Sequence, residues 1–342
     1  MSLERLLVLY EPEAASRDRL VARGFAAEIA AEIAFYLAQA TDFAAMEPAI
    51  RTRLGEAGIG LVTAPLDAVD GWLPELRRPG TLVWALTDGF AYYRGSFVSS
   101  LAGLLDVPQF GSPPAAQHLC QDKFRSGAVV RAAGMTTPAT ALARDGKLLS
   151  PPPPDGTLFV KPNTLGAKLG IEADSRVASL DEALALSRRI WARYRDAVVI
   201  QPYVEGRDVR VSFLDPGDGR ARPGLYAVRT AERGFPTLAD SLRITRLRAA
   251  DGDAVRLERI DAPQLEAAAL HAADILGLRD VWSMDFRLAP DGTPWFLEFE
   301  VCPAVTIYDF LTYLDDAYGL DLGTALALAA PAAYARRQEG SS

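Results

Sequence analysis

The chain has 342 residues, of which 49% are hydrophobic and 23% charged, a composition typical of a packed globular protein with two or three units. Its formal net charge of −8 argues against a broad nucleic-acid-binding or acidic-membrane surface, because such surfaces need excess positive charge. The two cysteines form no CxxC motif and the chain has only two histidines, so any metal site is expected to use oxygen ligands.

The N-terminus lacks the features of a signal peptide, and no apolar run is long enough to span a bilayer. We therefore expect a cytoplasmic protein that binds neither nucleic acid nor membranes. Cys120 and Cys302 are expected to be buried thiols without a disulfide, as in a reducing compartment.

An α/β unit is expected over residues 1–112. Residues 5–10, 60–62 and 81–86 have the continuous apolar character of buried strands, and residues 26–40 have the alanine-rich periodicity of a helix. Strands separated by helical segments are typical of a layered, open α/β sheet.

A second, smaller unit is expected over residues 113–196. It begins with a helix at 117–133, continues through a proline-rich exposed loop at 151–156, and contains a buried strand at 158–161. A helix over 181–194 follows, and the preceding Ser-Leu-Asp-Glu resembles a capping box.

The third unit, over residues 197–342, is expected to have α+β character within an overall α/β fold. It starts with a strand at 197–201 and contains helices at 263–276 and 322–337.

The strongest chemical signal is a pair of alternating runs, residues 281–288 and 293–300, on either side of an Asp-Gly turn. With Asp291 and Gly292 as a two-residue loop, the apolar face pairs Leu288 with Trp295, Phe286 with Leu297, and Met284 with Phe299.

The same register sets Asp285 opposite Glu298, with Glu300 two residues further along that face. Like charges facing each other across a ladder need a cation or open solvent. Oxygen-only ligands suit Mg²⁺, so we predict a metal site, with a solvated acidic face as the alternative. Arg287 is positioned to pair with one acid but cannot cover all three.

Lysine occurs at only four positions: Lys123, Lys147, Lys161 and Lys168. A compact ammonium charge suits phosphate oxygens, although ordinary surface lysines are the simpler interpretation. Lys161 ends a buried strand, and the following loop contains Gly166 and Lys168, a composition that lets backbone N–H groups turn toward phosphate. A plain hairpin loop is the alternative.

A bend between two strands contains Gln201, Val204 and Asp208. Backbone groups there could pair with an adenine edge while Asp208 accepts ribose hydroxyl bonds, or the segment could simply connect two strands.

Five motifs in order resemble the ATP-grasp superfamily, most closely the carboxylate–amine ligases similar to D-alanyl-D-alanine ligase. They are Gln-Asp-Lys-Phe from 121, Phe-Val-Lys-Pro from 159, Val-Ile-Gln-Pro-Tyr-Val-Glu-Gly from 199, Met-Asp-Phe from 284, and Phe-Leu-Glu-Phe-Glu-Val-Cys-Pro from 296. The resemblance extends from about residue 110 to 306 and is faint before residue 81.

The resemblance implies an ATP-grasp fold with an N-terminal open α/β domain, a small lid and a C-terminal catalytic domain, with ATP between the last two. It implies ATP and Mg²⁺, with Mn²⁺ as an alternative, acting on small-molecule carboxylate and amine substrates; a homodimer is compatible with it. The implied residues are Lys123, Lys161, Gly166, Lys168, Gln201, Val204 and Asp208 for nucleotide, and Asp285, Glu298 and Glu300 for metal.

Departures from the family concern the substrate. The family's arginine for the tetrahedral intermediate falls at Ser283, its oxyanion glycine at Ala304, and its carboxylate-receiving serine at Asp309. Further departures are Glu-Pro-Glu in place of the glycine-rich start, Ala167 for the loop serine, and Glu300 for the usual asparagine. The missing arginine is expected to be replaced from the set Arg229, Arg233, Arg243 and Arg246.

These observations predict an ATP-dependent ligase that forms a C–N bond through an acyl phosphate. D-Alanyl-D-alanine ligase itself and a noncatalytic nucleotide-binding regulator are the alternatives. An ionised Asp309 would repel an acceptor carboxylate and favour an amine or polar group, unless it only caps the following helix.

Overall fold

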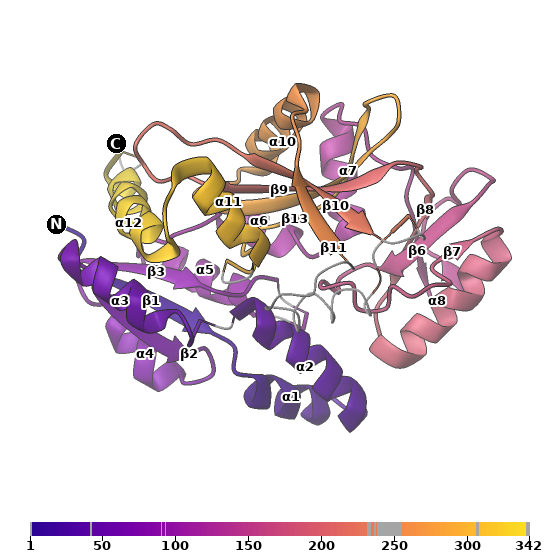
Figure 1. The fold of residues 1–342 in the computed structure, drawn as a ribbon. Coiled ribbons are helices and arrows are strands. Elements are labelled where there is room, and N and C mark those ends of the chain that lie inside the picture. The colour runs from indigo at the N-terminus through magenta and orange to yellow at the C-terminus, as the bar shows by residue number, and fades with distance from the viewer. Residues whose placement is uncertain are drawn as a thin grey trace.

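The computed structural model describes residues 2–41, 43–89, 91–92, 94–230, 234–235, 237, 255–305 and 308–339. Three separate sheets organise it, and Figure 1 shows each with its own helices. None of the described helices combines the length and apolar composition that crossing a bilayer requires.

The N-terminal sheet is parallel, with strand order β2-β1-β3. β1 (Arg5–Tyr10), β2 (Gly60–Pro65) and β3 (Thr81–Ala85) confirm the three strands expected there. The helices of this part are α1 (Glu13–Ala22), α2 (Ala27–Thr41), α3 (Glu47–Glu56), α4 (Val69–Leu76) and α5 (Gly95–Leu104). One face of the sheet packs with α3 and with the chain's last helices, and the other with α4 and α5.

The prediction of a single helix at 117–133 is wrong. The chain forms α6 (Pro114–Leu119) and α7 (Lys123–Ala132), separated at Asp122. The Asp122 carboxylate accepts a hydrogen bond from the backbone N–H of Arg125, which makes Asp122 the N-cap of α7. This new helix start fixes Lys123 in the first turn of α7.

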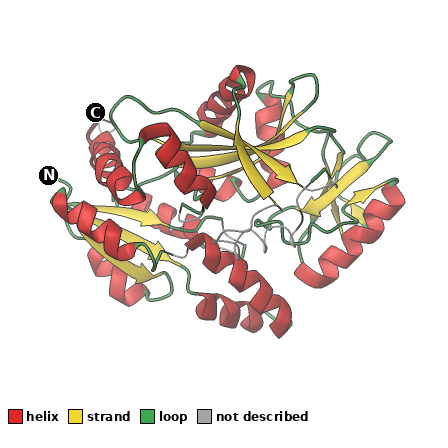
Figure 2. Ribbon diagram, in the orientation of Figure 1, coloured by secondary structure: helices red, strands yellow, loops and turns green. Residues whose placement is uncertain are grey.

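The central sheet is antiparallel, with order β5-β4-β8-β6-β7. Its strands are β4 (Ala141–Arg144), β5 (Lys147–Leu148), β6 (Leu158–Pro162), β7 (Arg176–Val177) and β8 (Val198–Pro202), and α8 (Leu180–Tyr194) covers one face (Figure 2). The Ser179 hydroxyl accepts from Glu182 N, while the Glu182 carboxylate reaches Ala178 N, one residue before the position of an ideal capping box.

The strand expected at 197–201 is present, but it pairs with β4 and β6. The strand therefore belongs to the central sheet. The predicted boundary between residues 196 and 197 assigns it to the C-terminal unit. The division into 1–112, 113–196 and 197–342 otherwise stays a prediction.

The C-terminal sheet is antiparallel, with order β11-β10-β9-β12-β13. Its strands are β9 (Arg207–Leu214), β10 (Gly224–Thr230), β11 (Val255–Arg259), β12 (Val281–Leu288) and β13 (Pro294–Glu300). Its helices are α10 (Pro263–Leu276), α11 (Tyr308–Tyr318) and α12 (Leu322–Glu339), so the helices expected at 263–276 and 322–337 are confirmed.

The α1–α2 hairpin shares an apolar core with the central sheet. Leu20, Ile33 and Leu37 pack in one buried cluster with Val160 and Ile200. Polar contacts border this core: Tyr92 OH donates to Tyr194 O at 2.5 Å, and Arg195 donates to the carbonyls of Arg23 and Gly24. The central sheet is thus attached to the N-terminal part by packing as well as by hydrogen bonds.

Candidate active site

The acidic face of the β12–β13 hairpin has the predicted order. Asp285 pairs with Glu298, Met284 with Phe299, and Ser283 with Glu300. Side chains alternate along a strand, so Glu298 and Glu300 lie on the same face as Asp285. The three acids therefore form one patch, as the sequence predicts.

The turn of this hairpin differs from the prediction. Ala289 N donates to Thr293 O and Gly292 N donates to Ala289 O, so the loop has three residues, with Gly292 at φ 85°. This moves the pairing by one residue near the turn, so Phe286 faces Phe296 and Leu288 faces Pro294. The pairs Leu288–Trp295 and Phe286–Leu297 are therefore wrong.

A β-bulge then restores the predicted register at the acids. The register shifts between Asp285 and Phe286, which leaves Leu297 as the extra residue on β13. Beyond it, Asp285 and Glu298 face each other as they would with a two-residue loop and no bulge. Leu297 instead lines a small pocket beside the acids.

Two lysines from outside the C-terminal sheet converge on Glu298. Lys123 Nζ, from the first turn of α7, lies 3.0 Å from Glu298 Oε2, and Lys161 Nζ, at the end of β6, lies 3.6 Å from Oε1. Both lysine side chains are nearly inaccessible, at 5% and 4% exposure, whereas that of Glu298 is 26% exposed. The site is therefore assembled from α7, the central sheet and the C-terminal sheet.

Burial and neighbouring charge act in opposite directions on these groups. Burial alone would raise the pKa of Glu298, but the charges of Lys123 and Lys161 lower it well below its usual range. Burial lowers the pKa of Lys161, and Glu298 partly opposes this. Glu298 is consequently ionised at neutral pH and holds both ammonium groups at the end of the acid patch.

Arg210 is a site residue that sequence reasoning missed. It lies on β9, directly opposite Asp285 on β12, and its Nε is 3.1 Å from Asp285 Oδ1. Its guanidinium also reaches Asp309 at 3.3 Å and Glu300 at 3.8 Å. The available signal was strand alternation, which puts Arg210 on the same face of β9 as Asp208.

No three carboxylate, histidine or cysteine side chains are arranged as ligands of one metal ion within the described part of the chain. The acids engage cations and a hydroxyl instead, since Ser283 Oγ donates to Glu300 at 2.9 Å. The donor set nevertheless fits Mg²⁺, which prefers oxygen ligands. Burial raises the pKa of Glu300, and the charges of Asp285 and Glu298 raise it further against the opposing charge of Arg210. A divalent cation bound to these acids would oppose that rise and favour their ionised forms.

The loop after β6 has an unusual backbone conformation and is held by side chains from other elements. Ala167 and Lys168 both have left-handed backbones, with φ of 53° and 61°, which non-glycine residues adopt at an energetic cost. Lys123 Nζ donates to Leu165 O at 2.8 Å. The buried Asp196 carboxylate accepts from the N–H groups of Thr164 and Leu165, and burial raises its pKa to about 6.

Lys168 of this loop lies close enough to Asp285 and Arg210 to interact with their charges. Burial lowers its pKa, with the charge of Arg210 acting in the same direction and Asp285, Asp208 and Asp309 opposing. Gly166 is part of the same loop and follows Leu165, whose carbonyl accepts the hydrogen bond from Lys123. The assignment of this loop to phosphate stays a prediction.

The bend after β8 borders the small pocket. Gln201, Val204 and Asp208 line it together with Phe159, Tyr203, Phe235, Leu297 and Lys161, so planar apolar surface and polar groups occur side by side. Gln201 Nε2 donates to Thr140 Oγ1 at 2.9 Å. In Figure 1, β8 belongs to the central sheet and β9 to the C-terminal sheet, so the bend connects the two sheets.

Arg287 organises the polar side of this pocket. Its Nη1 donates to Asp208 Oδ1 at 2.7 Å, its Nε to Val204 O at 2.9 Å, and its Nη2 to Tyr203 OH at 2.8 Å. The expected pairing of Arg287 with an acid thus involves Asp208 and leaves the patch of Asp285, Glu298 and Glu300 to other cations. Burial raises the pKa of Asp208, and the charge of Arg287 limits the rise.

Three of the four arginines expected to replace the family's catalytic arginine lie outside the described residues. These are Arg233, Arg243 and Arg246, and Arg229 is described only as a backbone position on β10, opposite Arg256. Asp309, in the first turn of α11, accepts from Phe310 N with one oxygen and from Arg210 with the other.

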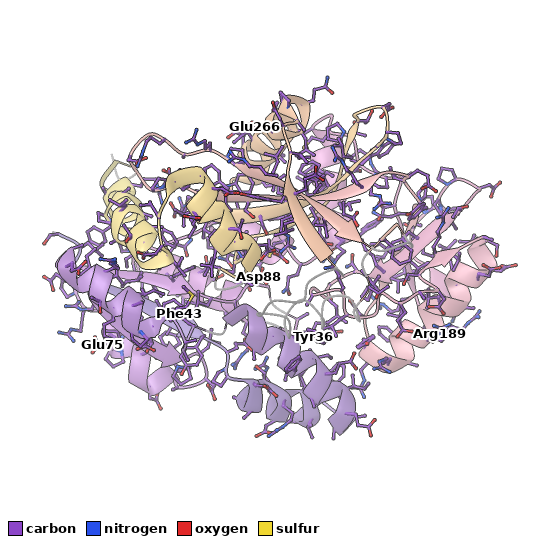
Figure 3. All side chains as sticks on the ribbon, in the orientation of Figure 1. Tyr36, Phe43, Glu75, Asp88, Arg189 and Glu266 are labelled. Carbon is purple, nitrogen blue, oxygen red and sulfur yellow. The ribbon has the colours of Figure 1, made fainter. Side chains whose placement is uncertain are left out.

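Asp88, shortly after β3, is a second residue that the sequence did not single out. It is 7% exposed and accepts from Gln121 Nε2 at 2.6 Å. Burial and the charge of Glu300 raise its pKa to about 7. Figure 3 labels Asp88 near the centre of the molecule, whereas Arg189 lies on the outer helix α8.

Solved structures share this architecture. The D-alanine–D-alanine ligase of Bacillus anthracis aligns with 98% of this chain and 99% of its own, at a TM-score of 0.68 and 18% identity. Its complex with ATP aligns with 99% and 100%, at a TM-score of 0.65 and 17% identity. The three sheets therefore form an ATP-grasp fold.

Residues 156–327 match the family model described as D-ala D-ala ligase C-terminus, and the chain belongs to this family. The D-alanine–D-alanine ligase of Aromatoleum aromaticum is 30% identical over 235 residues, covering 68% of this chain and 72% of that protein. That of Synechococcus sp. (strain JA-3-3Ab) is 27% identical over 217 residues, which is 61% of this chain and 63% of the relative. The chain thus spans somewhat less than two thirds of the latter relative's length.

Proposed function

We propose that the chain is an ATP-dependent carboxylate–amine ligase. The observation that carries the proposal is the convergence of Lys123 and Lys161 on Glu298, beside Asp285 and Glu300. Lysines from two other parts of the fold meet a carboxylate patch here, which suits polyphosphate bound between the central and C-terminal sheets. Family membership, relatives named D-alanine–D-alanine ligase, and a solved structure of such a ligase in complex with ATP support the same reaction class.

The reaction has two balanced steps. A substrate carboxylate oxygen attacks the γ-phosphorus of ATP, and the bond to ADP breaks, giving an acyl phosphate. The amine nitrogen then attacks the acyl carbon, phosphate leaves with the electron pair of the C–O bond, and the amine loses a proton. Such phosphoryl transfer depends mainly on positioning and charge neutralisation, so no protein nucleophile is required.

The position of each described residue suggests its role in the proposed reaction. The pocket lined by Gln201, Val204 and Asp208 would hold the nucleoside, and Lys123, Lys161 and Lys168 would bind phosphate oxygens. Asp285, Glu298 and Glu300 would hold Mg²⁺ or Mn²⁺, which supplies charge neutralisation at the phosphates when bound. The lysines would then exchange part of their contact with Glu298 for contact with phosphate.

The identity of the amine acceptor remains part of the proposal. Asp309 should repel an acceptor carboxylate less than the sequence suggests, because Arg210 pairs with Asp309 at 3.3 Å. D-Alanine is therefore a full second candidate, and the D-alanine–D-alanine ligases among the relatives favour it. A noncatalytic nucleotide-binding regulator is the remaining alternative.

Phosphate release distinguishes these functions. Purified protein with Mg–ATP would be tested with D-alanine alone and with a panel of other amino acids and amines, and the products identified by mass spectrometry. A ligase releases phosphate in proportion to a new amide product. Tight ATP binding without release on any member of the panel would favour the regulator.

The cellular setting is proposed on chemical grounds. Cys120 and Cys302 are both buried and free, and burial raises the pKa of each thiol well above its ordinary value. Unpaired cysteines are the state that a reducing cytoplasm maintains, so we place the protein there. A homodimer is the proposed assembly, to be tested by light scattering.

A further inference from the structure

Arg210 links three acids that come from two different parts of the C-terminal unit. Asp285 and Glu300 belong to the β12–β13 hairpin, whereas Asp309 lies at the start of α11. The Arg210 side chain is 23% exposed, and the two oxygens of Asp285 lie 3.1 and 3.3 Å from its Nε and Nη2. This is a forked contact between a guanidinium and a carboxylate, in which both groups are fixed in orientation.

The guanidinium occupies the position of a counterion. Arginine keeps its positive charge at any ordinary pH, so Arg210 neutralises part of the acid patch permanently. A divalent cation held by Asp285 and Glu300 would lie within a few ångströms of this charge and would be repelled by it. Binding of the metal and the present contacts of Arg210 with these two acids therefore compete.

Asp309 gives Arg210 an alternative partner. It contacts Nη1, a different nitrogen from those that face Asp285, so this contact can persist when the other two are lost. A guanidinium released from the hairpin but retained by Asp309 would still present a planar pair of N–H donors beside the metal. Such a fork matches the carboxylate of an acyl substrate.

We infer that Arg210 is a positioning residue that couples loading of the divalent cation to binding of the carboxylate substrate. Without the cation it acts as counterion to Asp285 and Glu300. With the cation bound, Asp309 retains it, and its freed N–H groups orient the substrate carboxylate that accepts the γ-phosphoryl group. This inference rests on the proposed ligase function.

The first test measures Mn²⁺ binding without nucleotide, by calorimetry and by electron paramagnetic resonance. Arg210→Gln removes the competing charge and should bind Mn²⁺ at least about tenfold more tightly than the parent. Arg210→Lys keeps the charge and should resemble the parent. Arg220→Gln is the matched control, because Arg220 forms an exposed ion pair with Asp218 in the β9–β10 connection.

The second test measures steady-state kinetics with the carboxylate substrate. Arg210→Gln and Arg210→Lys should both raise the KM for the carboxylate at least about tenfold, since each lacks the planar fork, while the KM for ATP stays within about threefold. Tighter metal binding together with poorer use of the carboxylate is a combination that general loss of structure would not produce.

Asp309→Asn provides a test that leaves Arg210 in place. Its guanidinium would then depend more on Asp285 and Glu300, so Mn²⁺ binding should become weaker, opposite in sign to Arg210→Gln. Unchanged or weaker Mn²⁺ binding by a folded Arg210→Gln, or tighter binding by Asp309→Asn, overturns the inference. Failure of the parent itself to bind Mg–ATP or release phosphate would instead overturn the proposed function.

Discussion

Replacing Lys161 with alanine should weaken binding of Mg–ATP by about 10- to 150-fold. The side chain is 4% exposed at the end of β6, and its Nζ lies 3.6 Å from Glu298. One charge-assisted contact with phosphate contributes about 1.5 to 3 kcal/mol, and each 1.4 kcal/mol changes a dissociation constant about tenfold. Lys123 remains to hold Glu298 in its ionised form, so the variant loses a phosphate contact without losing the whole ion pair.

The affinity should also depend on pH through Lys161. Burial lowers its pKa, so its ammonium form is lost at a lower pH than that of an ordinary lysine. Phosphate prefers the charged form, and binding by the parent should therefore weaken as the pH rises through this lowered pKa. The Lys161→Ala variant should lose that pH dependence.

Isothermal titration calorimetry with Mg–ATP, without carboxylate or amine, measures both effects. Lys147→Ala is the control, because Lys147 is an exposed residue on β5. Lys123→Ala should weaken binding at least as much as Lys161→Ala, since Lys123 also donates to Leu165 O in the loop. Equal affinities for the Lys161 and Lys147 variants would refute the assignment of the buried lysines to phosphate.

Three further predictions concern acids. Glu298→Gln should lower both the unfolding temperature and ATP-dependent turnover. The reason is that two buried ammonium groups lose their counterion, at a cost of about 2 to 4 kcal/mol. An unfolding temperature from calorimetry and a rate of phosphate release that both match the parent would contradict this. Asp88 has a pKa raised from 3.8 to about 7, so its burial penalises folding increasingly from about pH 4 to 7. The unfolding temperature of Asp88→Asn minus that of the parent should therefore be larger at pH 8 than at pH 5. The opposite trend would show that Asp88 does not ionise in this range. Asp309 repels an acceptor carboxylate only as far as Arg210 leaves its charge uncompensated, so Asp309→Ser should increase dipeptide synthesis from D-alanine alone. Rapid synthesis by the parent that Asp309→Ser leaves unchanged would argue against divergence at Asp309.

The β12–β13 hairpin shows what the alternation of apolar and polar residues can and cannot predict. The alternating runs predict the acid patch correctly, because burial of one face determines which residues point away from the core. The loop length and the bulge at Leu297 each shift the pairing by one residue, and the two shifts cancel before Asp285. The correct placement of the acids therefore depended on a bulge that no periodicity indicates.

Arg210 could not be placed at the site from local pattern alone. Its contact with Asp285 joins residues 75 apart in sequence, through the pairing of β9 with β12. The sequence indicates both strands but not their adjacency. The start of α7 at Asp122, by contrast, could have been predicted from the sequence. Aspartate is a favoured N-cap residue, and its carboxylate accepts a hydrogen bond from the backbone N–H three residues later, here that of Arg125.

The core shared by the α1–α2 hairpin and the central sheet restricts how nucleotide can enter and leave. Lifting the central sheet away from Leu20, Ile33 and Leu37 would expose apolar surface, at roughly 25 cal/mol for each Å². Rotation of the two as a single rigid body avoids that cost. The bending would then fall in the connections of both parts to the rest of the chain: after β1 for the hairpin, and before β4 and between β8 and β9 for the central sheet.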